Sequence, residues 1–273
     1  MLKLMYITND INIAQIAQDN GVDRIWIDLE TKGKEERQAG MNTVKSNHSI
    51  EDIKKLRPYI NKSELLVRIN PWDDESSCEV EKVIEAGADI IMLPMWKTID
   101  QVCEFVKKVN GKTKTMLLLE TKDAEECLDE VLRIDGIDEI HIGLNDLHLE
   151  YGLTFMFELL ANGTVERICK KISKAGIPYG FGGVGRIGGG LLKADNIVVE
   201  HYRLGSSMVI LSRAFCNTSG STDLNEIRNV FETNIKKMRL FEKKVQQNFT
   251  EKDYQDNQLQ VINLVETIVS NKG

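Results

Sequence analysis

Hydrophobic positions along the chain occur in short runs, and most of these runs follow an amphipathic helical stretch. Three segments share the order Gly, a small or branched residue, Asp and a short β-branched run: "NGVDRIWID" from Asn20, "AGADIIMLP" from Ala86 and "DGIDEIHIG" from Asp135. "AGIPYGFGG" from Ala175 and "LGSSMVILS" from Leu204 are looser copies. Such a glycine is typical of a helix end, and such an apolar run of a strand buried on both faces. The repeated unit therefore predicts a parallel α/β fold.

Three further apolar runs lie between these segments. They are "KLMYI" near the start, "ELLVRIN" at 64–70 and "TMLLLE" at 115–120. Eight strands separated by helices favour a (β/α)8 TIM barrel over an open doubly wound sheet. The length of 273 residues also suits a barrel, which typically needs about 250.

The pattern changes after residue 221, so we predict a barrel domain at 1–220 and additional C-terminal helices at 221–273. An apolar stripe at helical spacing is followed by a polar break, "QQNFTEKDYQDNQ", and by a second short apolar helix around Ile262–Val269. The stripe either packs into the core as the eighth helix or contacts a neighbouring subunit. The sharper hypothesis is a homo-oligomer in which residues 221–247 pack against another copy. The stripe consists of Leu224, Ile227, Phe231, Ile235, Met238 and Val245.

Composition narrows the classes of function. The net charge of −7 argues against a nucleic-acid-binding protein, whose domain is normally basic. The five cysteines are scattered and odd in number, which indicates reduced thiols and neither a disulfide framework nor a zinc site. The N-terminal residues lack the pattern of a signal peptide, and no run approaches the roughly 20 apolar residues of a membrane span. We therefore expect a cytoplasmic protein without nucleic-acid or membrane partners.

Acidic residues stand where several predicted strands end. The second strand ends in Asp28 and Glu30, the fifth at Glu120 and the sixth at Asp146. Because the carboxyl ends of barrel strands share one rim, these side chains should converge there, with Arg68 of the third strand among them. On one reading, Arg68 neutralises a structural carboxylate cluster. On the other, Glu120 and Asp146 hold a divalent metal, and oxygen ligands favour Mg²⁺ or Mn²⁺ over zinc.

Several of these segments resemble one known family. "WIDLE", "LLVRINPWDD", "EAGADIIMLPM" and "LLLETKDAEECLDEVLRIDGIDEIHIGLNDL" with the following "YG" are similar to the HpcH/HpaI aldolase and citrate lyase beta-subunit family, across about residues 20–215. The resemblance implies a (β/α)8 barrel, Mg²⁺ or Mn²⁺, and reversible carbon–carbon cleavage that yields pyruvate or another enolate. It also implies that Glu120 and Asp146 are the metal ligands, and that Arg68 contacts the keto-acid carbonyl or enolate oxygen. Barrels of this family commonly exchange their last helix and form multimers, which again suggests a homo-oligomer.

This assignment is chemically coherent for a 2-keto acid or hydroxy-keto acid substrate. Such an acid chelates one metal through its carboxylate and carbonyl, and the metal stabilises the enolate. Arg68 would add a fixed positive charge beside the same oxygen. We expect backbone N–H groups around Gly143, Leu144 and Asn145 to hold the substrate carboxylate.

The sequence departs from the family at the expected base. Aldolases of this family have a histidine after the strand-2 Glu, whereas Thr31 follows Glu30 here. The loop from Thr31 to His48 is long and carries Lys32, Lys34, Arg37 and Lys45. His48 is either a solvated loop histidine or a replacement base on the catalytic rim. The departure also motivates an alternative function, a barrel without lyase turnover that retains the metal site and binds a keto acid or a protein partner.

The glycine-rich stretch "GFGGVGRIGGG" at 180–190 contains the spacing of a dinucleotide fingerprint. That motif belongs to the first βα unit of a sheet, whereas this stretch is predicted to follow the seventh strand. A flexible rim loop is the favoured interpretation, with Arg186 facing a distal carboxylate or phosphate of the substrate. Among the other histidines, His141 is expected to pack inside strand six, His148 could approach the site, and His201 lies on the helix before strand eight.

Overall fold

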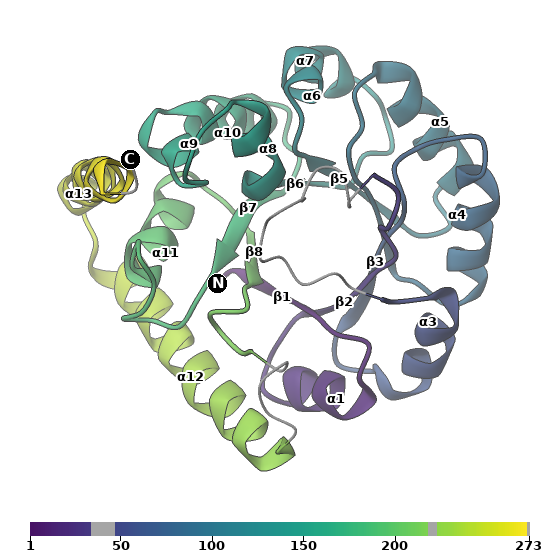
Figure 1. The fold of residues 1–273 in the computed structure, drawn as a ribbon, viewed down its shortest axis with the longest axis horizontal. Coiled ribbons are helices and arrows are strands. Elements are labelled where there is room, and N and C mark those ends of the chain that lie inside the picture. Colours follow the sequence, from purple (N-terminus) through teal and green to yellow (C-terminus); the bar gives the residue numbers. More distant parts are fainter. Residues whose placement is uncertain (34–46, 218–222, 272–273) are drawn as a thin grey trace.

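The structure is a computed structural model that describes residues 1–33, 47–217 and 223–271. Eight parallel strands close into a barrel in sequence order, with helices around the outside (Figure 1), which confirms the predicted (β/α)8 TIM-barrel fold. The strands are β1 (Lys3–Ile7), β2 (Arg24–Asp28), β3 (Glu64–Arg68), β4 (Ile90–Leu93), β5 (Lys114–Leu119), β6 (Glu139–Ile142), β7 (Tyr179–Val184) and β8 (Met208–Leu211).

Helices connect the strands and cover the barrel. The described helices before β8 are α1 (Ile11–Asp19), α3 (Ile50–Leu56), η1 (Arg57–Tyr59), α4 (Ser76–Glu85), α5 (Ile99–Val109), α6 (Lys122–Glu126), α7 (Leu128–Val131), α8 (Leu144–Glu150), α9 (Glu158–Ala161), α10 (Thr164–Lys174) and α11 (Ala194–Arg203). Two long helices follow β8, namely α12 (Leu224–Asn248) and α13 (Glu251–Ser270). None of the helices in the described ranges is both long and apolar enough to cross a membrane.

The barrel interior is a packed core. An apolar cluster of inward-facing strand residues fills its middle, and a larger cluster lies between the strands and the surrounding helices. Because the interior is filled, ligand chemistry is confined to the two ends of the barrel. The buried members of the interior cluster are Met5, Trp26, Leu66, Ile90, Met92, Met116, Leu118 and Met208.

The glycine-rich stretch at 180–190 is placed differently from the prediction. Its first five residues belong to β7 itself and do not follow the strand. A Cβ on Gly180 would lie 2.2 Å from the backbone oxygen of Met208, and one on Gly182 would lie 2.7 Å from Leu144 Cδ1. These glycines therefore allow β7 to pack closely against β8 and α8. The next helix begins only at Ala194, which agrees with the rejection of a dinucleotide fingerprint.

The apolar stripe of α12 is buried within its own chain, except for Leu224, which is 39% exposed. α12 runs along α1 and α11 on the outside of the barrel (Figure 1), and Phe231 and Met238 are fully buried. The Phe231 ring packs edge-on against Tyr6 of β1, with 5.0 Å between centroids. The stripe thus packs against its own barrel as the eighth helix, and the homo-oligomer in which residues 221–247 also contact another copy stays a prediction.

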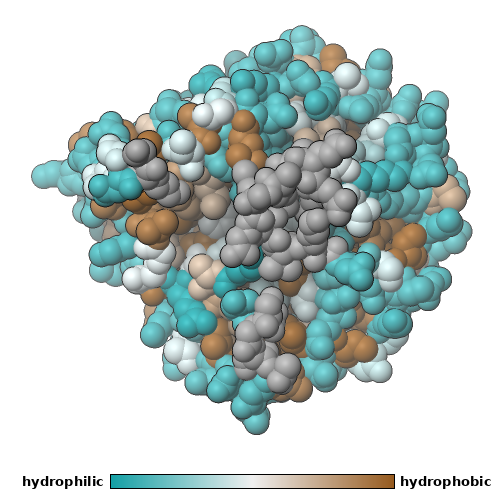
Figure 2. Space-filling view, in the orientation of Figure 1, coloured by the Kyte–Doolittle hydropathy of each residue, from teal (hydrophilic) through white to brown (hydrophobic). Residues whose placement is uncertain are grey.

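The predicted polar break between the C-terminal helices exists but is much shorter than expected. α12 continues to Asn248, and α13 starts two residues later. The Thr250 backbone N–H donates to Asp253 Oδ2 at 2.7 Å, and the Asp253 N–H donates back to Thr250 Oγ1, so the polar stretch contains a capping box. α13 packs against α9 and α11 (Figure 1) and is additional to the barrel. Figure 2 shows scattered hydrophobic side chains around it on an otherwise largely hydrophilic face.

Candidate active site

Arg68, the last residue of β3, lies in a buried ion-pair cluster at the carboxyl end of the barrel. The register of the sheet places it opposite Asp28, the last residue of β2. Its Nε and Nη2 donate to the two Asp28 carboxylate oxygens at 2.8 and 2.9 Å, and its Nη1 lies 3.1 Å from Glu30 Oε2. The predicted rim residues Asp28 and Glu30 are therefore brought together with Arg68.

The surroundings of Arg68 keep it charged. Burial alone would lower its pKa, but the carboxylates of Asp28 and Glu30 outweigh burial and raise the pKa above its ordinary value. The guanidinium also lies over the Trp26 ring, 5.3 Å from its centroid. Within the described residues, its ion pairs use three of its five N–H donors, so the planar group retains donors for a ligand.

Glu120, directly after β5, is a buried carboxyl beside other acids. Burial, then the charges of Asp146 and Glu30, raise its pKa well above the ordinary value, while Arg68 acts in the opposite direction. Its Oε1 accepts a hydrogen bond from the backbone N–H of Met95 at 3.2 Å. Met95 has φ of 51°, a conformation that non-glycine residues rarely adopt. The loop after β4 thus aims a backbone donor at Glu120.

Gly143 makes room for Glu120. A Cβ on Gly143 would lie 2.7 Å from Glu120 Oε2 and 2.9 Å from Glu120 Cβ, so a larger residue would displace the carboxylate. Gly143 is also the N-cap of α8, whose first turn carries Leu144, Asn145 and Asp146. The turn from β6 into α8 therefore brings Asp146 close enough to Glu120 for the two charges to interact.

The donor set at Glu120 and Asp146 fits a hard divalent cation. Two neighbouring carboxylates repel one another, and a cation between them removes the repulsion. Magnesium commonly takes one or two protein carboxylates and completes its shell with water and substrate oxygens. Across the described residues, no group of three or more His, Cys, Asp or Glu side chains is arranged to hold a metal. Glu120 and Asp146 would therefore offer a metal two carboxylates, and their role as its ligands stays a prediction.

His48 lies at the same rim, as the sequence predicted, but one ring nitrogen is engaged. Its Nδ1 accepts a hydrogen bond from the backbone N–H of Asp28 at 3.0 Å. Ser49 and Asp52 form the predicted capping box of α3 immediately after it. The bond to Asp28 occupies the lone pair that a neutral imidazole would use as a base. His48 thus helps to satisfy the end of β2, and its catalytic role stays a prediction.

Thr31 and Lys32 are fixed by a residue that the sequence analysis missed. Asn70 Oδ1, just after β3, accepts hydrogen bonds from the backbone N–H groups of Thr31 and Lys32 at 2.9 and 3.1 Å. The Lys32 ammonium pairs with Asp73 and Glu75, each at 2.6 Å. Asn70 could have been suspected because it ends the run "ELLVRIN", whereas nothing in the sequence indicated Met95. The other basic residues predicted for this loop, at 34, 37 and 45, lie outside the described residues.

The remaining predicted residues are less closely connected with the ion-pair cluster. Arg186 is exposed, and its Nε donates to the backbone oxygen of Phe215 at 2.7 Å. His148 is buried and turned toward its own helix, with Nδ1 3.2 Å from the carbonyl oxygen of Leu144. His141 is fully buried, as expected. His201 lies on α11 and stacks on Phe181 at 3.8 Å between centroids.

Comparison with protein-family models shows to which family this barrel belongs. The model of the HpcH/HpaI aldolase/citrate lyase family matches residues 4–179, which is more than half of the chain. The chain belongs to this family.

The individual proteins that resemble this chain have low sequence identity to it. A hydroxypyruvate/pyruvate aldolase of Sagittula stellata is 22% identical over 110 residues, covering 30% of this chain and 43% of that protein. The crystal structure of a family protein from Burkholderia cenocepacia J2315 superposes with a TM-score of 0.64 at 15% identity, over 83% of this chain and 94% of that chain. The citrate synthase SbnG superposes with a TM-score of 0.61 at 16% identity, over 83% and 92%. At these identities the structures support the fold.

Proposed function

We propose that this protein is a metal-dependent carbon–carbon lyase that forms or cleaves a 2-keto acid. The observation that carries the proposal is the cluster of Arg68, Asp146 and the buried Glu120 at the carboxyl end of a barrel of this family. Relatives named as an aldolase and a citrate synthase support a reaction at a carbon–carbon bond.

In this proposal Glu120 and Asp146 would hold Mg²⁺ or Mn²⁺. The metal, when bound, supplies Lewis-acid stabilisation of a developing enolate. Arg68 donates its remaining N–H groups to the keto or enolate oxygen, and Asp28 and Glu30 hold the guanidinium in place. Gly143, Leu144 and Asn145 stay predictions for contact with the substrate carboxylate.

Among the residues that the structure describes, proton transfer has no clearly placed residue in the proposed mechanism. Thr31 replaces the family histidine, and its backbone N–H is bound to Asn70. His48 could act as the base only after giving up the bond that its Nδ1 accepts from Asp28. These two observations favour a second candidate function, in which the metal site is retained for binding a keto acid or a protein partner without turnover.

Retro-aldol turnover separates the two functions. Purified protein is mixed with a panel of 4-hydroxy-2-keto acids and Mg²⁺ or Mn²⁺, and pyruvate release is followed. The lyase proposal expects turnover that stops on chelation and is lost in Glu120→Gln. The exposed Glu81→Gln is the matched control and should behave like the wild type. If no substrate releases pyruvate while a metal still binds, the binding function is the better account.

Metal binding has its own test, independent of substrate. We expect Glu120→Gln and Asp146→Asn to abolish calorimetric binding of Mg²⁺ or Mn²⁺ and to leave the fold intact, because each variant removes one of two charged ligands. Circular dichroism checks the fold. Undiminished affinity in both variants would remove the metal assignment.

A further inference from the structure

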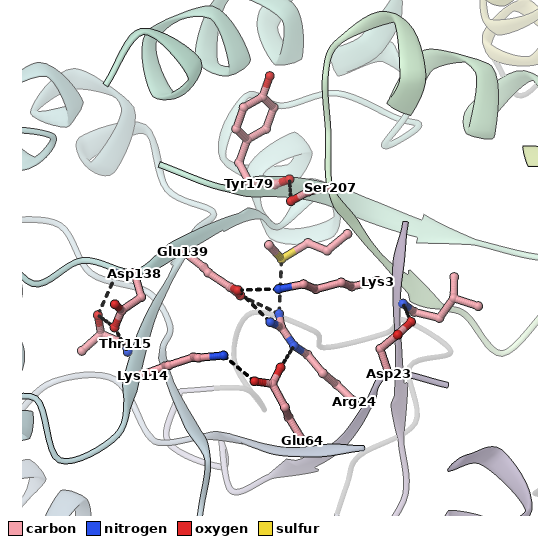
Figure 3. A network of polar contacts seen from close by, with 12 residues as sticks. Lys3, Asp23, Arg24, Glu64, Lys114, Thr115, Asp138, Glu139, Tyr179 and Ser207 are labelled. Atoms are coloured by element: carbon pink, nitrogen blue, oxygen red, sulfur yellow. Dashed lines mark hydrogen bonds and ion pairs between the residues drawn. The ribbon is translucent and has the colours of Figure 1, made fainter. Parts of the chain in front are cut away.

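The other end of the barrel carries a charged cluster that the proposed function does not use. The first residues of five strands meet there, as Figure 3 shows. We call them the base cluster: Lys3, Arg24, Glu64, Lys114 and Glu139.

Arg24 is the fully buried centre of the base cluster. Its Nη1 and Nη2 contact the two oxygens of Glu139 at 2.5 and 2.7 Å, and its Nε donates to Glu64 at 2.9 Å. Both carboxylates are thus engaged by one guanidinium.

Two lysines share these same carboxylates. The Lys3 ammonium contacts Glu139 at 3.2 Å, and the Lys114 ammonium contacts Glu64. Figure 3 shows the two lysines approaching the centre of the base cluster from opposite sides. Their side chains are 43% and 48% exposed, so both ammonium groups are accessible from outside the barrel. The base cluster therefore has three cations for two carboxylates, in a chain whose net charge is −7.

A pocket of about 660 Å³ opens over the base cluster. Four cations line it, of which Arg57 pairs with Asp89 and Lys62 with Asp19. The other two, Lys3 and Lys114, belong to the base cluster. The volume is within the range of small-molecule sites. The apolar cluster inside the barrel separates this pocket from Arg68 and Glu120 at the opposite rim, so the pocket is not part of the candidate active site.

We propose that this pocket binds a small phosphate-bearing anion between Lys3 and Lys114. Each ammonium has three N–H donors and makes one contact within the base cluster, so both can also donate to phosphate oxygens. The base cluster has one cation in excess of its carboxylates, which favours an anion in this pocket. Asn61 and Ser63 add polar groups to the lining, and the volume exceeds that of a bare phosphate, which suits a phosphorylated metabolite.

Calorimetry and thermal unfolding at constant ionic strength test this site on the full chain. The probes are inorganic phosphate and glycerol 3-phosphate, with a chelator present so that a metal site cannot contribute. We expect saturable binding and a raised unfolding temperature, because a ligand that binds only the folded state stabilises it. Stronger binding of the ester identifies a phosphorylated metabolite, and stronger binding of phosphate identifies the free ion.

Substitutions in the pocket test whether the probes bind between Lys3 and Lys114. Lys114→Met should weaken binding at least tenfold, and Lys3→Met provides the same test if the first variant does not fold. The exposed Lys112→Met does not line the pocket and should bind like the wild type. Arg68→Lys should also retain binding, which distinguishes this site from the candidate active site. The proposal is overturned if neither probe binds. It is also overturned if Lys114→Met and Lys3→Met both bind the probes with the affinity of the wild type.

Discussion

At the scale of single residues, Arg68 combines a permanent charge with a fixed orientation. Asp28 binds two of its nitrogens and Glu30 approaches the third, so the guanidinium plane cannot rotate without losing both partners. A rigid planar donor fits an oxygen that gains charge during a reaction better than a flexible ammonium does.

We therefore expect Arg68→Lys to lose about 10²-fold or more in lyase turnover while metal binding persists. Lysine retains the charge but cannot form the two-pronged contact with Asp28. Steady-state pyruvate release and calorimetry with Mg²⁺ measure the two properties. The exposed Arg133→Lys is the matched control. A variant within a few-fold of the wild type would place Arg68 outside the site.

His141 predicts a pH dependence of stability. Burial lowers its pKa to about 4, so the folded state keeps the ring neutral while an unfolded chain protonates it near pH 6.5. The unfolded state then binds more protons between these values, and stability falls as pH decreases through this window. From pH 7 to pH 5 the loss should be about 2 kcal/mol. Urea unfolding of His141→Gln should show a smaller loss, whereas an identical pH dependence would contradict the assignment.

Sequence reasoning found the charged residues of the rim but not their partners. Strand-end positions were enough to group Arg68, Glu120 and Asp146, because parallel strands end on one side. The engagement of His48 Nδ1 and the left-handed backbone of Met95 depend on how loops close over the strand ends. Spacing carries no information about such contacts.

At the scale of elements, strands were more predictable than helix ends. Short buried runs gave all eight strands, but glycines hid the extent of β7 beyond Tyr179, because they look like a loop until their tight packing against Met208 is known. The start of α13 was missed for a similar reason. Its first turns are polar because they are exposed, and the capping pair Thr250 and Asp253 was the available signal.

The position of α12 predicts the effect of substitutions on it. We expect Phe231→Ala to lower the free energy of unfolding by about 3–5 kcal/mol, because the ring is fully buried against Tyr6 and Phe215. Leu240→Ala on the same helix is the control, since Leu240 is 58% exposed and should change stability by less than about 0.5 kcal/mol. Urea unfolding measures both. Equal stability of the two variants would mean that α12 does not close the barrel.

At the scale of the whole molecule, the barrel is polar at both ends and apolar between them. Arg68 with its carboxylates occupies one end, the base cluster occupies the other, and the interior apolar cluster lies between. The base cluster joins strands that are far apart in sequence, since Arg24 belongs to β2 and Glu139 to β6. It therefore ties opposite sides of the barrel together.

This arrangement makes Arg24 a determinant of global stability. Arg24→Met should destabilise the protein by about 3–5 kcal/mol, because it leaves the buried Glu139 without its main partner. Lys3→Met should cost far less, since Lys3 is 43% exposed and its pair is screened by solvent. The double variant Arg24→Met/Glu139→Leu should recover much of the loss, because no unpaired charge remains buried. Urea unfolding of the wild type, Arg24→Met, Glu139→Leu and the double variant gives the coupling, and additive effects of the two substitutions would show that the Arg24–Glu139 pair does not hold the base of the barrel together.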